Sequence, residues 1–251
     1  MALSIRNHEI ANRFLLALPQ AVLSALLPEM HPVELNRGAV LGRSGEGVKQ
    51  IWFVNRGLVS LVKTMKDGRT IEVGATGSEG LTTPEALFGD PTAALDSIVQ
   101  IPGSAFVIAR TTLEHIMAQY DALADLLQRY IHVMMERLAQ TAACNRLHSL
   151  EERCCRWLLI AHDSAHADAF PLTHEFLAMM LGVQRPGVSV AMKILQRAGY
   201  VEYSHGKVTI ADRGGLEATA CECYSTLQRQ LDRLFHHAGD GKAAQEHPLY
   251  S

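Results

Sequence analysis

The sequence predicts an α+β protein with three parts in a fixed order. An N-terminal β-roll of the double-stranded jelly-roll type is expected over 1–110, because short β-branched segments alternate there with Gly-containing turns. A long helix is expected over 111–148, in a stretch where no Gly or Pro occurs between 116 and 169. A winged helix-turn-helix with a C-terminal helix is expected over 149–238, followed by a flexible tail over 239–251.

Composition limits the class of protein before any motif is considered. The chain has 251 residues, 48% of them hydrophobic and 20% charged, with a net charge of −3. No apolar run approaches the roughly 20 residues that a membrane span requires, and the start MALSIRNHEI has no apolar core of a signal peptide. We therefore expect no membrane partner and a cytoplasmic location.

The N-terminal segments show clear local signals. Two short helices are expected within the first 32 residues, where Pro19, Pro28 and Pro32 interrupt the apolar pattern. Asp67-Gly68 lies between the apolar runs 58–65 and 69–75, which is a strong signal for a β-hairpin.

The central helix carries an apolar stripe at coiled-coil spacing, with steps of four and three residues. This spacing is typical of a helix that pairs with another helix. A symmetric homodimer is the simplest source of that second helix. The alternative is a helix that packs on its own domain. A further helix is expected over 150–162. The expected dimer-interface residues are Ile116, Tyr120, Leu123, Leu127, Tyr130, Met134 and Leu138.

The segment 172–210 has the capping and turn residues of a helix-turn-helix with a wing. Thr173 suits an N-cap, Gly182 a left-handed turn, and Pro186 the first turn of a second helix. The core side of that second helix is expected to hold Val188, Met192, Ile194 and Leu195. A hairpin should turn at His205-Gly206, and Asp212 should N-cap one terminal amphipathic helix.

These features are typical of a module that reads DNA with the N-terminal end of its second helix. Arg185 can donate two hydrogen bonds to guanine, Gly187 lets the backbone approach closely, and Lys193 can reach phosphate. Four Lys or Arg and two acidic residues give the segment a local charge of +2. The alternative is a winged helix used only for protein contacts. The candidate DNA-binding residues are Thr173, His174, Gln184, Arg185, Gly187, Ser189, Lys193, His205 and Lys207.

The order of these parts resembles the CRP/FNR family of bacterial transcription regulators over about residues 10–235. The resemblance is carried by LTHEFLAMMLGVQRPGVSVAMKILQRAGYVEYSHGKVTI, by IWFVNRGLVSLVKT with DGRTIEVGATGSEG, and by TAACNRLHSLEERCCRWLLIAHD. It implies a cyclic-nucleotide-binding-like sensor, a homodimer on a palindromic double-stranded operator, and RNA polymerase as a partner. It also places Arg185 at the main guanine-reading position, while Pro186 and Val190 depart from well-known members, so the target sequence should differ.

The sensor end departs further from the family's cyclic-nucleotide binders, which carry a Gly-Glu and an Arg before Ser or Thr. The run 77–103 contains no Lys, Arg or His, and its charged residues are Glu79, Glu85, Asp90 and Asp96. The base-contacting pair of the family falls near Leu138 and Ala139, which cannot supply polar contacts. We therefore expect no binding of cyclic AMP in the usual manner. The effector, a small molecule, stays unidentified, and its expected pocket region contains Gly77, Glu79, Gly80 and Leu81.

The cysteines and histidines suggest no cofactor. The five cysteines form no CxxC pair, and none precedes Cys144, which argues against a disulfide framework and against the family's N-terminal iron–sulfur cluster. Haem is left open, with His115 and His132 as candidate ligands. His162 and His166 have a metal-binding spacing, but the helix is expected to end there, so no metal site is predicted.

The other cysteine pairs are expected to be buried thiols. Cys154 and Cys155 are adjacent on a helix, and Cys221 and Cys223 should diverge on another. The alternative for the first pair is a redox switch, since Arg153 and Arg156 could lower a thiol pKa. No GxSxG, P-loop or HExxH pattern occurs, so no enzyme is expected. The leading function is a DNA-binding regulator, and the alternative is a ligand-binding module that acts through protein contacts with a vestigial winged helix.

Overall fold

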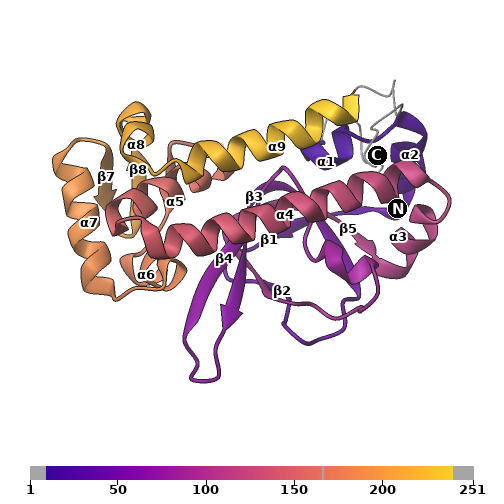
Figure 1. Cartoon of the computed structure of the whole chain (residues 1–251), viewed down its shortest axis with the longest axis horizontal. Coiled ribbons are helices and arrows are strands. Elements are labelled where there is room, and N and C mark those ends of the chain that lie inside the picture. Colours follow the sequence, from indigo (N-terminus) through magenta and orange to yellow (C-terminus); the bar gives the residue numbers. More distant parts are fainter. Residues whose placement is uncertain (1–9, 166, 240–251) are drawn as a thin grey trace, which may run out of the picture.

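The computed structural model describes residues 10–165 and 167–239, and it confirms the α+β class (Figure 1). An antiparallel sheet domain occupies one end of the molecule and a winged-helix domain the other, with one long helix running between them. His166 and the expected tail after Gly239 lie outside the described residues. Among the described helices, none is long and apolar enough to cross a membrane.

The two expected N-terminal helices are present and cover the sheet domain. They are α1 (Arg13–Leu16) and α2 (Gln20–Leu26), followed by the 3-10 turn η2 (Leu27–Glu29). Asn12 caps α1 by accepting a hydrogen bond from the Leu15 backbone N–H at 2.9 Å. Its side-chain amide also donates to the backbone oxygens of Val54 and Gly80, each at 2.7 Å. This one buried side chain therefore joins α1 to the sheet and to the loop at 77–81.

All the pairings in the main sheet are antiparallel, and the strand order is β1-β5-β3-β4, with β2 paired to β5. Asp67-Gly68 turns β3 into β4 as predicted. Strand β3 also extends before the predicted run 58–65, because Gly57 at φ 91° lets the strand bend without breaking. The elements are β1 (His31–Leu35), β2 (Val40–Gly42), β3 (Gln50–Thr64), β4 (Thr70–Thr76), η3 (Pro84–Leu87) and β5 (Asp96–Ala109).

The expected continuous central helix is divided into α3 (Arg110–Met117) and α4 (Asp121–Leu147). The absence of Gly and Pro did not keep it continuous, because Tyr120 is in an extended conformation and starts α4 as its N-cap residue. Ile116 and Tyr120 therefore do not share a helix with the rest of the predicted stripe.

The predicted dimer seam is wrong for its most buried members. Ile116, Leu123, Leu127 and Tyr130 lie inside the core of their own sheet domain, where Tyr130 packs edge-on against Phe14. Tyr120 and Met134 are partly buried against the same core. A three-and-four spacing shows that a helix face is buried, but not what covers it. This buried face of α4 thus packs on its own domain, as the alternative had it for these residues.

The C-terminal half is a winged helix with a small sheet in the order β6-β8-β7. The predicted single terminal helix is divided: Asp212 accepts a hydrogen bond from Gly215 N–H and caps α8, and the chain turns before α9. Helix α9 then runs back along α4 (Figure 1). The elements are α5 (Leu150–Ala165), β6 (Ala169–Pro171), α6 (His174–Leu181), α7 (Arg185–Arg197), β7 (Val201–Ser204), β8 (Lys207–Ile210), α8 (Arg213–Thr219) and α9 (Cys223–Gly239).

The two halves share buried surface. Leu58, Val62 and Ile101 of the sheet belong to the same apolar cluster as the core of the winged helix. The turn residue Gly182 lies so close to Ile71 of β4 that an added Cβ would come within 2.5 Å of its Cδ1 atom. Sensor and output domains therefore touch directly, and α4 is not the only connection between them.

Candidate functional site

Helices α6 and α7 form the predicted helix-turn-helix. The Thr173 hydroxyl accepts a hydrogen bond from the Phe176 backbone N–H at 3.2 Å, which caps α6. Gly182 adopts the left-handed conformation at φ 64°, and Pro186 lies in the first turn of α7. Val188, Met192 and Leu195 are buried as expected. Ile194 was predicted to face the core but is 46% exposed, so α7 presents an apolar as well as a basic outer surface.

Arg185 begins α7 and its side chain is free to reach a ligand. The side chain is 65% exposed, and its Nε atom lies 3.8 Å from Oε2 of Glu175, which is itself exposed. An ion pair of this kind contributes little stability in water, so a phosphate or a base can displace the carboxylate. Lys193 is exposed two turns along α7, and Gln184 precedes the helix in an exposed position.

His174 and Ser189 have a structural role that the sequence did not predict. Nδ1 of His174 lies 3.0 Å from the Ser189 hydroxyl, and its ring stacks on Tyr203 of the wing. Its Nε2 atom is buried without a partner. Burial lowers the pKa of His174, and the positive charges of Arg185 and Lys193 lower it further. His174 therefore joins α6, α7 and the wing, because Ser189 engages its Nδ1 atom and its Nε2 atom is buried away from solvent.

Gly187 also faces its own chain. An added Cβ would lie 3.2 Å from Cδ2 of Leu150 at the start of α5. A larger residue there would need the Leu150 side chain to move by a few tenths of an ångström, so Gly187 favours close packing of α7 on α5. This role differs from the close approach to DNA that the sequence suggested.

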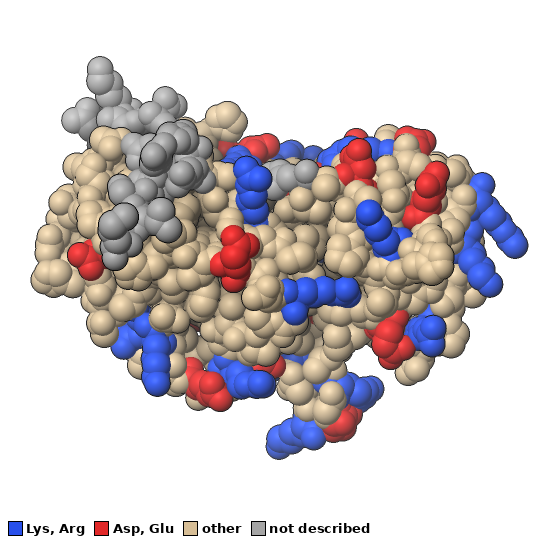
Figure 2. Space-filling view, turned by 180° about the vertical axis from the view of Figure 1, so that it is seen from behind, with Lys and Arg blue, Asp and Glu red and all other residues tan. Residues whose placement is uncertain are grey.

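The wing presents polar side chains beside α7. His205 takes a left-handed turn at φ 49°, and its Nδ1 atom lies 2.7 Å from the Ser204 hydroxyl. Lys207 follows that turn, Thr173 lies beside Gly206, and both are exposed. Seen from behind, Lys and Arg side chains project from the end of the molecule that carries the winged helix (Figure 2). The exposed members of the predicted set therefore lie at one end of the protein.

The loop at residues 77–81, the expected pocket region, is filled by side chains from α4. Nη1 of Arg137 donates a hydrogen bond to Oε1 of Glu79 at 2.9 Å, and both side chains are nearly buried. A Cβ on Gly80 would lie 1.9 Å from the Tyr130 hydroxyl oxygen. No local pattern marks Arg137 as part of this loop, and Tyr130 was assigned to the dimer seam instead. The two residues lie 58 and 49 positions from their partners in the loop.

An apolar groove adjoins this loop. It has a volume of about 200 Å³ and lies between α4 and the sheet domain. Pro84 and Leu95 line it from the sheet domain, while Ile131, Met135 and Leu138 line it from α4. Its lining offers few polar groups to a nucleotide, whereas Met135 extends into solvent at its edge with 63% of its surface exposed.

Glu72 on β4 connects the sheet domain to α5 electrostatically. Burial raises its pKa to about 7, while a hydrogen bond from the Ser60 hydroxyl and the charge of Arg156 act in the opposite direction. The carboxyl group thus titrates near neutral pH at the contact between the two domains.

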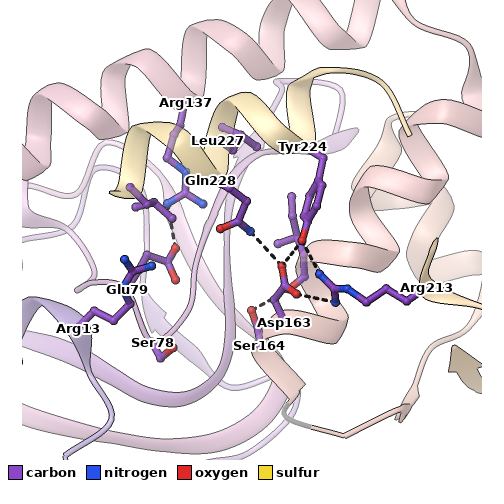
Figure 3. Close-up of a pocket in the computed structure, with 12 residues that line it drawn as sticks. Arg13, Ser78, Glu79, Arg137, Asp163, Ser164, Arg213, Tyr224, Leu227 and Gln228 are labelled. Atoms are coloured by element: carbon purple, nitrogen blue, oxygen red, sulfur yellow. Dashed lines mark hydrogen bonds and ion pairs between the residues drawn. The ribbon is translucent and has the colours of Figure 1, made fainter. Parts of the chain in front are cut away.

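A polar cavity of about 300 Å³ opens where α4, α5, α9 and the 77–81 loop meet (Figure 3). Asp163 of α5 accepts hydrogen bonds from Arg213, Tyr224 and Gln228, with distances of 2.8 to 3.0 Å. The Glu79–Arg137 pair forms the opposite wall of the same cavity. The cavity is therefore lined by two charged networks, one around Glu79 and one around Asp163, and the charged groups of each are paired within that network.

The remaining candidates have structural surroundings. Burial raises the pKa of Cys154 and of Cys155 to about 12, so the nearby arginines do not activate these thiols as the redox-switch alternative required. His162 lies between Asp168 and Arg213, which occupy both of its ring nitrogens. His115 and His132 are exposed, and each contacts a neighbour one helical turn away.

Comparisons with known families agree with this arrangement. Residues 32–120 match the cyclic nucleotide-binding domain, and residues 152–219 match the Crp-like helix-turn-helix domain. The chain is 25% identical over 207 residues to the HTH-type transcriptional regulator Cmr of Mycobacterium tuberculosis, which covers 79% of this chain and 80% of the relative.

Solved structures share the fold. A putative transcriptional regulator of the Crp/Fnr family from Eubacterium rectale matches with a TM-score of 0.64 and 18% identity, over 84% of this chain and 95% of the other. FixK2 from Bradyrhizobium japonicum matches with a TM-score of 0.65 and 17% identity, over 76% of this chain and 98% of the other. At these identities the likeness supports the fold alone.

Proposed function

Because this chain belongs to the CRP/FNR family of transcription regulators, with the sensor and helix-turn-helix domains in the family's order, we propose that it binds a specific DNA sequence as a homodimer. The observation that carries the proposal is Arg185, an exposed guanidinium at the N-terminal end of α7, held only by a weak ion pair. The N-terminal end of a recognition helix is where base edges are read. The function involves no catalysis, and it places the protein in the cytoplasm with RNA polymerase as a partner.

The exposed surface of α7 supports reading of a mixed sequence. Arg185 can donate two hydrogen bonds to a guanine. Val190 and Ile194 are exposed on the same helix and offer apolar contact, which suits a thymine methyl group. Lys193, Thr173, His205 and Lys207 surround them and can bind phosphates, which position the helix without specifying sequence.

For the homodimer we propose the exposed stripe of α4 in place of the buried seam. Met135, Ala139 and Ala142 follow each other at helical spacing and are exposed. The sheet domain and α9 pack against other sides of α4, so a second copy must contact an exposed side, and this stripe is an apolar one. Small residues there let two helices approach closely around Met135 in a symmetric contact.

For the sensor we propose an effector other than cyclic AMP in its usual mode. A cyclic phosphate needs a cation in its site, and Arg137, whose side chain contacts the loop, is engaged by Glu79. The neighbouring groove is apolar, which suits an uncharged ligand better than a nucleotide. Calorimetry with cyclic AMP tests this: micromolar binding that is lost on changing residues 79–97 would contradict it.

DNA binding is tested with the purified full chain by fluorescence anisotropy at several salt concentrations. Arg185→Ala should weaken specific binding by about 10- to 100-fold, since one bidentate base contact contributes about 1–3 kcal/mol. Arg197→Ala removes an equal charge from the exposed C-terminal end of α7, so it should lower affinity for all sequences slightly and evenly.

Two outcomes separate this proposal from its alternative. Loss of specificity in Arg185→Ala but not in Arg197→Ala supports a DNA reader. A wild-type chain without DNA affinity even at low salt would instead favour a regulatory module that acts through protein contacts.

For the dimer, Met135→Lys should shift sedimentation toward the monomer. Met65→Lys changes a similarly exposed methionine at the tip of the β3–β4 hairpin and should not.

A further inference from the structure

Four potential metal ligands converge where α4 ends and α9 begins. Cys144 and His148 lie one turn apart at the C-terminal end of α4, while Cys221 and Cys223 flank Glu222 at the start of α9. One donor atom from each of the four lies within 4.8 Å of all the others. The three thiols are buried and the imidazole is half-buried. Chain folding has thus brought together two pairs that are about 75 residues apart.

Two of the six spacings between these atoms match those around one tetrahedral ion. Zinc bonds of about 2.3 Å to sulfur and about 2.0 Å to nitrogen place tetrahedral ligands about 3.8 Å apart for two sulfurs and about 3.5 Å apart for sulfur and nitrogen. The Sγ atoms of Cys144 and Cys221 are 3.6 Å apart, and Sγ of Cys223 is 3.5 Å from Nδ1 of His148. A multi-iron cluster would spread its thiolates further, since each binds a different iron.

The surroundings of the four ligands also fit a metal site. Nε2 of His148 lies 3.1 Å from a carboxylate oxygen of Glu222, which leaves Nδ1 facing the thiols. A carboxylate on the far nitrogen is the usual partner of a histidine that binds zinc. Nε2 of Gln140 donates to Sγ of Cys223 at 2.9 Å. Buried Arg153 and Arg156 place positive charge near Cys144, which suits the net negative charge of three thiolates and one zinc ion.

We propose that Cys144, His148, Cys221 and Cys223 bind one zinc ion, which fastens α9 to the end of α4. Binding displaces the three thiol protons to solvent and changes no oxidation state. A disulfide between Cys144 and Cys221 is the competing use of these thiols. It would need an oxidant, and it would leave Cys223 and His148 without a role although they point to the same place. The set of three cysteines and one histidine is a common structural zinc site.

The position of the site determines what the zinc ion does. Tyr224, which follows Cys223, donates a hydrogen bond to Asp163 of α5, the centre of the polar network that lines the cavity of about 300 Å³. A metal ion that fastens the start of α9 to the end of α4 therefore also fixes this network, which joins α5, α8 and α9. Zinc removal should loosen the contact between the end of α4 and the start of α9 and lower the melting temperature of the full chain.

The test is metal binding by the purified full chain, independently of DNA. Native mass spectrometry of wild-type protein reconstituted with zinc should show one ion per chain. Cobalt, which reports tetrahedral thiolate coordination by its visible absorption, should give that spectrum with the same stoichiometry. Cys144→Ser and Cys221→Ser should abolish both signals. Cys154→Ser removes an equally buried thiol outside the cluster and should leave both unchanged.

Glu222→Gln tests the surroundings of the site and does not depend on folding of a cysteine variant. It should keep the stoichiometry and weaken zinc affinity by about 10- to 100-fold in a chelator competition. Wild-type protein that binds no zinc after reconstitution would overturn the proposal. So would zinc binding that survives Cys221→Ser, or a Cys144–Cys221 disulfide that persists in reductant and blocks reconstitution.

Discussion

The winged helix and the sensor loop of this protein are held in place by different kinds of interaction. In the winged helix, the Thr173 cap and the Gly182 turn are formed by residues close in sequence to the helices they shape. The sensor loop at 77–81 is closed by Tyr130 and Arg137, which reach it from a helix about 50 residues away. The output end thus depends on local signals, and the sensor end on long-range contacts inside a core.

This difference separates stability from function. Substitutions in the sensor loop leave buried groups without partners or force atoms together, so they should cost folding stability. Substitutions on the outer face of α7 alter exposed groups, so they should change DNA binding with little effect on stability. Four substitutions test the stability side of this comparison.

The largest effect is expected from breaking the buried ion pair of the sensor loop. Arg137→Met should lower the free energy of unfolding by about 3 kcal/mol, because it leaves the Glu79 carboxylate nearly buried without its partner. Glu79→Gln combined with Arg137→Met should recover part of that loss. Arg129→Met, at an exposed position of the same helix, is the control. Urea denaturation measures all three, and a double variant as unstable as Arg137→Met would argue against the pair.

Gly80→Ala should be nearly as damaging. The new methyl group would lie 1.9 Å from the Tyr130 hydroxyl oxygen, so loop and helix must separate, at a cost of about 2–3 kcal/mol. Gly47→Ala adds the same methyl where no atom lies within 4 Å, and it should be tolerated. Equal unfolding midpoints for the two variants would show that α4 does not press on the loop.

Glu72→Gln should alter the pH dependence of stability. The folded pKa of about 7 exceeds the ordinary value of 4.5, so the contribution of Glu72 is fully present below about pH 4.5 and is lost as pH rises through 7. Glutamine resembles the protonated form and should stabilise the protein by about 2 kcal/mol at pH 8, with little change at pH 4.5. Unfolding curves at both pH values measure this. Glu34→Gln, at an exposed carboxyl group, should give no such difference.

The smallest effect is expected at the output end. Thr173→Ala removes the cap of α6 and should cost about 1 kcal/mol, while Thr173→Ser should retain stability. Thermal melting of both variants is the measurement. A loss for Thr173→Ala as large as that for Arg137→Met would remove the contrast between the two ends.

The same contrast explains what could be predicted from sequence. The Asp67-Gly68 hairpin, the Asp212 cap and the α6–α7 turn follow from residues adjacent in the chain, and all of them are observed. Spacing alone identified Leu123, Leu127 and Tyr130 as a buried face but assigned it to the wrong partner. The surface that covers a helix depends on distant segments, which periodicity does not report.

The cysteines show most clearly what sequence patterns do not predict. Cys221 and Cys223 were expected to diverge on one helix, but the chain turns between α8 and α9, so Cys221 precedes the helix and both thiols face the end of α4. No local signal marks that turn: neither Gly nor Pro occurs in the segment that separates the helices. His174 is similar, since its burial depends on Tyr203 of the wing.

Selection of bound sequences from a random DNA pool by the purified full chain tests the central claim most directly. The claim is that α7 reads bases and that two copies act together. We predict enrichment of a palindrome whose half-sites are about one helical turn apart, around 34 Å, each with a guanine whose enrichment is lost with Arg185→Ala. Enrichment of no sequence, or the same palindrome selected by Arg185→Ala, would contradict the account.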